Sequence, residues 1–254
     1  SSAKSAILGF LISSLAVTIF QARSLSAFFN NQKIQEKKNQ KIKKWVVDIW
    51  IYSIPYLPWT IIIWMQQSSG RWFLQFYSST SEVGVFAALF QLGFSPVLLL
   101  SGIAITFLQP IFYERTKIIN NKMVDNSGVT ILIRPILVIG GCVAVLSFIL
   151  TNFLHEEIFN LFVAEAYSGS SFLMPWLVLA AVLFGMSEVL LLKLQGDMKS
   201  VLLSKLKVIT GLFGILLNYI GVLFMGMQGL VGGIVIFSVF NLFIFLVYAN
   251  KQIR

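Results

Sequence analysis

Charged residues are scarce in this chain. Only 11% of its 254 residues are Asp, Glu, Lys or Arg, whereas 57% are hydrophobic and 23 are phenylalanine. An ordinary soluble domain carries about a quarter charged residues. A soluble core of this size does not hide so many apolar side chains, whereas a bilayer asks for helical runs of about 20 apolar residues, which recur along this sequence. The composition therefore predicts a membrane protein.

Cysteine and histidine occur once each. Cys142 lies inside an apolar run, where we expect a packed, buried thiol, and its being alone excludes an intrachain disulfide and a thiolate metal site. His155 precedes Glu156 and Glu157, but no second His or Cys stands nearby to complete a coordination sphere. We therefore expect His155 in an exposed loop, and we expect no metal or cofactor.

Acidic residues are few as well. Ten Asp and Glu stand against 19 Lys and Arg, which gives a net charge of +9. An excess of basic residues can indicate a nucleic-acid partner. Here the basic residues fall between apolar runs, and no soluble domain remains that could bind nucleic acid. Anionic lipid headgroups and membrane topology explain the charge better.

The apolar runs predict an all-α polytopic membrane protein with about seven transmembrane helices. The third run exceeds what a bilayer needs and contains Pro96 and Pro110, so we expect it to kink or to project. The last two runs join through "FMGMQGLVGG", which predicts a tight antiparallel hairpin with close helix contact at Gly229 and Gly233. The seven predicted spans are residues 3–22, 45–65, 83–112, 130–152, 172–194, 208–226 and 229–250.

Charges alternate between the two sides of the predicted membrane. One side is nearly bare of lysine and carries Lys4, Arg71 beside Glu82, and the acidic Glu156, Glu157 and Glu165. By the positive-inside rule the other, lysine-rich side faces the cytoplasm, and the carboxyl terminus lies on that side. We expect the protein in the cell's inner (cytoplasmic) membrane. That side holds Arg23, Lys33, Lys37, Lys38, Lys41, Lys43, Lys44, Arg115, Lys117, Lys122, Lys193, Lys199, Lys205, Lys207, Lys251 and Arg254.

The order of the segments predicts three parts. Residues 1–28 form one transmembrane helix, residues 29–44 form a basic cytoplasmic connector that touches anionic headgroups or only sets topology, and residues 45–254 form a six-helix lobe. This resembles the end of one half of a two-lobed transporter followed by its whole second half. We expect the missing lobe upstream of Ser1.

Three stretches sharpen that likeness. Arg71 precedes "EVGVFAALFQL", a helix ends in "QPIFYER", and Leu217 with Asn218 precedes a short hairpin containing Gly229 and Gly232. These stretches resemble the polysaccharide-biosynthesis flippases, of the O-antigen and teichoic-acid exporter type, in the multidrug/oligosaccharidyl-lipid/polysaccharide exporter superfamily. The chain departs from the family pattern at Phe86 and Phe90, where tyrosines are common, and at Gly70, where an Asp is usual.

The resemblance implies two six-helix bundles around a central cavity. The substrate would be an undecaprenyl-diphosphate-linked oligosaccharide, moved from the cytoplasmic to the outer leaflet for surface polysaccharide synthesis. An ion-coupled multidrug exporter of the same superfamily is one alternative, and a membrane glycan polymerase or ligase is another. We find no Ser/His/Asp set, no paired carboxylates and no large external loop, so we expect a chain that is not an enzyme.

Arg71 and Gln91 are the candidate substrate-binding residues. Arg71 is expected just beyond the second span on the external side, where its guanidinium fork suits a diphosphate, or pairs with Glu82 instead. Gln91 is polar within the third span and either faces the cavity or forms a hydrogen bond between helices.

Asp48, Arg134 and Glu188 are the candidate gate. Each lies one to two turns from the lysine-rich end of its predicted span, so the three share a similar depth. They either meet as an ion cluster that closes the cytoplasmic side, or extend separately to headgroups and helix ends.

Overall fold

The chain forms two compact units, Ser1–Ile51 and Tyr52–Arg254. A computed structural model describes residues 2–30, 46–51, 53–115, 117–119, 122–125, 127–162, 165–196 and 200–251. The first unit contains helix α1 (Ser2–Asn30) and a short helical segment at residues 46–51. Residues 31–45, and with them most of the predicted connector and its lysines, lie outside the described residues.

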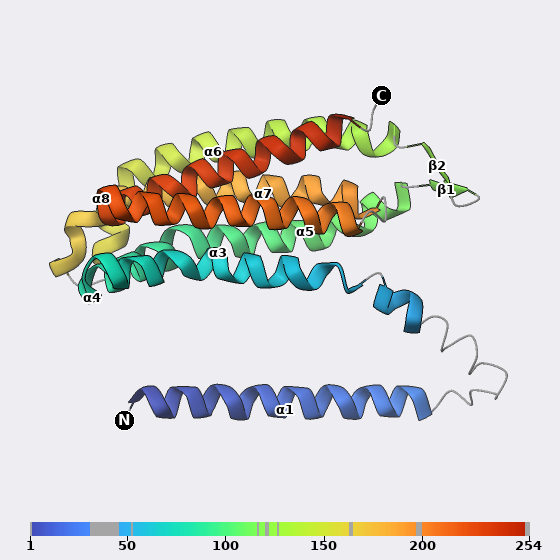
Figure 1. Ribbon diagram of the computed structural model, residues 1–254, viewed down its shortest axis with the longest axis horizontal. Helices are drawn as coiled ribbons and strands as arrows, with labels where there is room; N and C mark the ends of the chain where they lie inside the picture. The colour runs from blue at the N-terminus through green and yellow to red at the C-terminus, as the bar shows by residue number, and fades with distance from the viewer. Residues whose placement is uncertain are drawn as a thin grey trace. The chain divides into compact units, whose positions relative to one another are not determined.

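The second unit is a bundle of helices (Figure 1). The strands β1 and β2 pair antiparallel, with Ile119 opposite Lys122, and are the one hairpin of strands within the described ranges. The prediction of an all-α fold is therefore confirmed for the described residues apart from this hairpin. The elements are α3 (Tyr56–Tyr77), α4 (Thr80–Leu89), the π-helical turn η2 (Phe90–Phe94), α5 (Ser95–Arg115), β1 (Lys117–Ile119), β2 (Lys122–Asp125), α6 (Ser127–Phe162), the 3-10 segment η3 (Glu165–Leu173), α7 (Met174–Gly196) and α8 (Ser200–Lys251).

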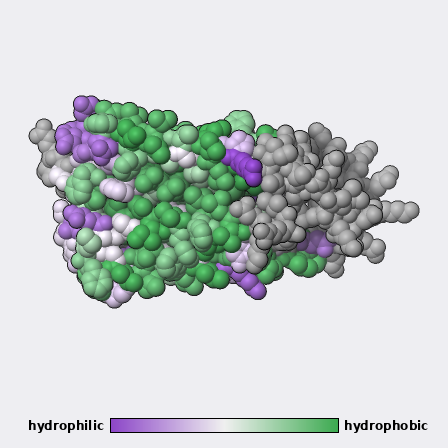
Figure 2. Space-filling view, turned by 90° about the horizontal axis from the view of Figure 1, so that it is seen from above, coloured by the Kyte–Doolittle hydropathy of each residue, from purple (hydrophilic) through white to green (hydrophobic). Residues whose placement is uncertain are grey.

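Five helices in the described part of the chain are long and apolar enough to cross a membrane. They span Val46–Tyr77, Thr80–Tyr113, Ile133–Phe162, Gly169–Gly196 and Ser200–Ala249. The composition and length of these helices are compatible with a multi-pass membrane protein, while the count of seven stays a prediction. Figure 2 shows hydrophobic side chains over the middle of one face and hydrophilic residues toward its ends. Large apolar side chains such as Val138, Leu146 and Phe153 are exposed on α6, where lipid would cover them.

Helix α8 reverses direction at Gly226. This glycine has a φ of 56° and a ψ of −132°, a backbone conformation that side chains disfavour, so the 52-residue segment is two helices joined by a kink. The two arms lie side by side (Figure 1). The hairpin predicted from "FMGMQGLVGG" is confirmed.

Glycines allow the two arms of α8 to touch through their backbones. A Cβ added at Gly221 or at Gly229 would overlap the carbonyl group of the other, and one added at Gly233 would lie 2.9 Å from the Leu217 carbonyl oxygen. Side chains at these positions would force the arms apart. The predicted close contact at Gly229 and Gly233 is therefore confirmed.

The third predicted span is irregular near Pro96. Helix α4 ends at Leu89, the π-helical turn η2 follows, and α5 begins at Ser95. Proline has no backbone N–H and its ring crowds the preceding turn, so a wider turn is an economical way to continue the helix. The Ser95 hydroxyl donates to the Phe90 carbonyl oxygen at 3.3 Å and helps to satisfy that turn.

Several predicted boundaries were wrong. The regular helix α3 runs to Tyr77, so Arg71 lies within it and not beyond the second span. Helix α6 extends to Phe162, so His155 is helical and half-buried instead of in an exposed loop. Cys142 is exposed on α6, where we had expected a buried thiol. Helical hydrogen bonding satisfies the backbone whatever the side chains are, so polar stretches at span ends continued as helix.

Helix α7 is the centre of the bundle and contacts α5, α6 and α8. Leu177, Ala180 and Ala181 are fully buried in one apolar cluster, and Leu194 is fully buried in another with Leu203. Helix α3 packs against α8. This α3–α8 contact holds most of the polar residues described next.

Candidate functional site

Polar side chains of α3 face the interior of the bundle. Gln66 and Ser69 are 6% and 2% exposed, and Gly70 is also buried. A Cβ at Gly70 would come within 2.8 Å of Leu230, so glycine lets α3 approach the second arm of α8. These α3 residues follow the predicted end of the second span at residue 65, but in the structure they continue the helix.

Asn218 of α8 joins this polar face. Its Nδ2 donates to the Ser69 hydroxyl at 2.8 Å and to the Gln66 carbonyl oxygen at 3.2 Å. The Ser69 hydroxyl in turn donates to the Gln66 carbonyl at 2.8 Å. Asn218 Oδ1 is buried and has no hydrogen-bond partner within the described residues. The amide therefore offers one unused acceptor in the interior, where leaving it unpaired is costly.

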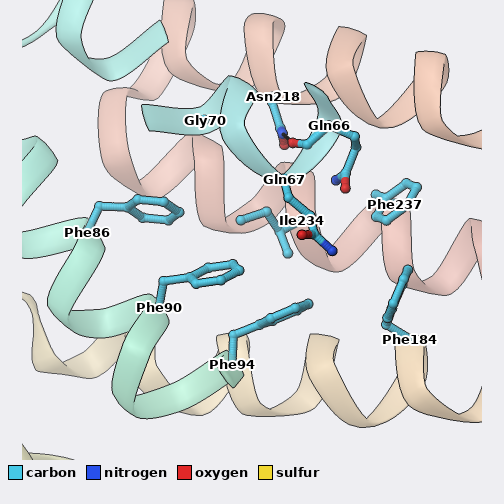
Figure 3. A pocket seen from close by; sticks show the side chains of 10 residues that line it. All are labelled: Gln66, Gln67, Gly70, Phe86, Phe90, Phe94, Phe184, Asn218, Ile234 and Phe237. Carbon is cyan, nitrogen blue, oxygen red and sulfur yellow. Dashed lines mark hydrogen bonds between the residues drawn. The ribbon is translucent and has the colours of Figure 1, made fainter. Parts of the chain in front are cut away.

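A cavity lies beside these amides (Figure 3). Its walls come from α3, α4, η2, α7 and both arms of α8, and the space open to the centre of a water molecule is about 20 Å³. That volume suffices for about one water. We call it the amide–aromatic cavity; it is lined by Gln66, Gln67, Gly70, Phe86, Phe90, Phe94, Phe184, Asn218, Ile234 and Phe237.

Phenylalanine rings form one wall of this cavity. Phe86, Phe90 and Phe94 follow one another at four-residue spacing, with ring centroids 5.8 Å and 4.6 Å apart. Phe184 of α7 continues the series, 6.4 Å from Phe94 and 5.9 Å from Phe237. In Figure 3 the Phe90 and Phe94 rings lie across from the Gln66 and Asn218 side chains, whereas Phe237 lies beside Gln66. The cavity therefore combines flat apolar surfaces with amide donors and acceptors.

Arg71 and Gln91, the predicted substrate-binding residues, lie near this cavity in different ways. Arg71 is exposed, and its guanidinium carbon is 5.9 Å from the centroid of the Phe90 ring, a wall of the cavity. Gln91 is exposed, accepts a hydrogen bond from the Ser95 hydroxyl at 3.4 Å, and is not among the described lining residues. The structure therefore brings Arg71 to the rim through Phe90. A substrate role stays a prediction for both.

Glu188, a member of the predicted gate, is ion-paired with Lys207 of α8. Arg134 is exposed on α6, and Asp48 is exposed in the first unit, so a pairing between Asp48 and Arg134 stays a prediction. Sequence reasoning missed Lys207 because it placed this lysine in a loop before a span at residue 208. Helix α8 begins at Ser200, which puts Lys207 two turns inside the helix.

Lys207 is enclosed. Its side chain is 1% exposed, against 22% for Glu188, and its Nζ lies 5.9 Å, 5.3 Å and 4.9 Å from the ring centroids of Trp59, Phe184 and Phe245. These residues come from α3, α7 and the second arm of α8. Phe184 also lines the amide–aromatic cavity, so this ring contacts both the cavity and Lys207.

Two further polar contacts tie α7 to the second arm of α8. Asn241 Nδ2 donates to the Ser187 hydroxyl at 2.5 Å, and buried Lys193 donates from Nζ to the Ala249 carbonyl oxygen at 2.9 Å. The interior of the bundle is thus polar along much of α8. These charges and amides hold the helices together and fix how each helix is rotated against its neighbour, which apolar packing alone does not do.

His155 and Ser171 form a separate contact, with Nδ1 and Oγ 3.0 Å apart. Within the described ranges, no three His, Cys, Asp or Glu side chains gather closely enough to hold a metal ion. Comparisons of the chain with protein-family models, with curated proteins and with solved structures found no match.

Proposed function

We propose that Tyr52–Arg254 is one lobe of a flippase that moves a lipid-linked oligosaccharide across the cytoplasmic membrane for surface polysaccharide synthesis. The observation that carries the proposal is the amide–aromatic cavity, which places carboxamides and phenylalanine rings inside a bundle of membrane-length helices. Polar groups in such an interior are costly and mark substrate pathways by default. The undecaprenyl-diphosphate carrier, the upstream lobe and the cytoplasmic orientation belong to the same proposal.

The chemistry of the cavity suits a sugar. Gln66, Gln67 and Asn218 supply donors and acceptors for hydroxyl groups, and Asn218 Oδ1 has an unused acceptor. The rings of Phe90 and Phe94 offer apolar faces against which the C–H face of a sugar packs. Arg71 at the rim adds a fork of N–H donors that fits a diphosphate.

The observed volume requires an opening step, because room for one water does not admit a sugar. The turn η2 carries Phe90 and Phe94 and is the irregular part of its span. Turns of this kind concentrate at functional sites. We place the opening there, with rocking of the two lobes then changing the side that the site faces.

Gln67 provides the direct test. Its carboxamide lines the cavity, but the residue is exposed and forms no hydrogen bond or ion pair within the described part of the chain, so Gln67→Ala should spare folding. The measurement is delivery of surface polysaccharide in cells lacking the native exporter, with membrane abundance checked by blot. Gln75→Ala changes an exposed glutamine of the same helix and serves as the control. We expect Gln67→Ala to lose most of the delivery; equal delivery by both variants would remove the cavity from the transport path.

The pairing of half-buried Glu188 with buried Lys207 favours one second candidate, an ion-coupled exporter. A carboxylate within a membrane-length helix is a group through which ion coupling can act. Efflux of a cationic dye from cells separates the two functions. The exporter is favoured if the parent chain delivers no polysaccharide but exports the dye, and if Glu188→Gln abolishes that export.

A further inference from the structure

A second hollow lies away from the amide–aromatic cavity, between the start of α3 and the start of α8. The space open to the centre of a water molecule is about 360 Å³, within the range of about 300 to 1,000 Å³ usual for ligand sites. We call it the proline groove. It is lined by Pro55, Pro58, Val201, Ser204, Lys205, Val208 and Ile209.

The groove follows from the sequence of both helices. Its α8 residues recur at intervals of three and four from Val201 to Ile209, so they form one stripe about 12 Å long on a single helix face. Opposite that stripe, Pro55 caps α3 and Pro58 lies in its first turn. Proline is favoured in the first turn of a helix, and its side chain is small. The two proline rings therefore do not cover the stripe on α8.

The groove lies where the helices would enter the bilayer. After Lys207, α8 has no charged residue until Lys251, and α3 has none before Arg71. Lys205 therefore stands at the polar end of an apolar stretch. It is exposed, and no described carboxylate forms an ion pair with it.

We propose that the proline groove binds an anionic phospholipid. The acyl chain lies along Val201, Val208 and Ile209, two of which are more than half exposed, and the phosphate pairs with the Lys205 ammonium. Basic pockets between membrane helices bind anionic headgroups through this combination of charge and apolar wall. The site goes beyond the proposed transport and does not depend on it.

The positive charge of Lys205 favours an anionic phospholipid over other occupants of the groove. A free phosphate would leave the apolar stripe in water, and a zwitterionic lipid would bring its own cation close to Lys205. An apolar helix of another chain would leave the lysine beside apolar side chains with its charge unpaired. An anionic phospholipid satisfies both the stripe and the ammonium.

Native mass spectrometry of the delipidated full chain tests the site. Phosphatidylglycerol and phosphatidylcholine are added separately, and the affinity for the first bound lipid is measured. We expect the parent to prefer phosphatidylglycerol, and Lys205→Gln to lower that affinity about fivefold, the factor expected when one lysine leaves an anionic surface. Lys122→Gln, in β2, removes the same charge elsewhere and should leave the affinity unchanged.

Two more experiments distinguish lipid binding in the groove from non-specific attraction of anionic lipid to the positively charged chain. Val201→Trp fills the stripe at an exposed position and should lower binding of both lipids, with Lys205 still present. A photo-crosslinking residue at Ile209 should capture phospholipid in native membranes. Equal losses for Lys205→Gln and Lys122→Gln, or a crosslink to another segment of this chain or to a second copy, would overturn the proposal.

Discussion

Breaking the pair of Lys207 with Glu188 should destabilise the bundle strongly, whereas removing both charges should not. Taking away one partner leaves the other buried and uncompensated, which costs about 3 to 5 kcal/mol of unfolding free energy. Replacing both by apolar side chains of similar size is often neutral or stabilising. The prediction therefore concerns coupling between Lys207→Met, Glu188→Met and their combination.

The two charges lie in different surroundings. Lys207 is 1% exposed and Glu188 is 22% exposed, so Glu188→Met leaves the more enclosed charge behind. Lys207→Met leaves the less enclosed charge, but it also loses the cation–π contacts with Trp59, Phe184 and Phe245, each worth about 0.5 to 1 kcal/mol. We therefore expect each single variant to cost about 3 to 5 kcal/mol.

The assay is reversible unfolding of the purified chain in mixed micelles with rising SDS. The double variant should lie within about 1 kcal/mol of the parent, which means a coupling energy of several kcal/mol. Lys205→Met is the matched control, because this lysine is exposed two positions away on α8 and should change stability by less than about 0.5 kcal/mol. Losses that simply add in the double variant would refute the ion pair as a coupled unit.

The remaining predictions concern packing, the polar interior, the cavity rim and topology. Gly229→Ala should push the arms of α8 apart and lower the midpoint of SDS unfolding, while Gly232→Ala, which has open space for a Cβ, should not; equal midpoints would contradict the backbone contact. Asn218→Leu should lower the midpoint of SDS unfolding, because it removes the two hydrogen bonds that join α8 to α3, and an unchanged midpoint would show that these bonds do not stabilise the bundle. Arg71→Lys should keep part of the polysaccharide delivery and Arg71→Ala should lose most of it, because lysine keeps the charge without the fork; full delivery by the alanine variant at normal abundance would exclude Arg71 from the site. A cysteine at Asn39, in a chain without its native cysteine, should resist an impermeant reagent in intact cells, and its labelling would reverse the predicted orientation.

The sequence predicted features that depend on local chemistry. Membrane-length apolar helices and the hairpin at Gly226 both follow from backbone rules that act within a few residues. The close approach at Gly229 also follows locally, since only a missing side chain permits it. The ends of the helices were less predictable. Hydropathy assigns a polar residue the same value whether it faces the interior of a bundle or lies in a loop.

The sequence by itself determined that this chain suits a bilayer, because apolar composition and helix length are sums over neighbouring residues. The tertiary structure alone decided which polar residues meet. Asn218 reaches Ser69 across 149 positions of sequence, and Lys207 reaches Glu188 across 19, by the packing of α8 against α3 and α7. A helix presents each side chain to one direction only, so whether a polar residue faces lipid, water or another amide depends on which helix lies beside it.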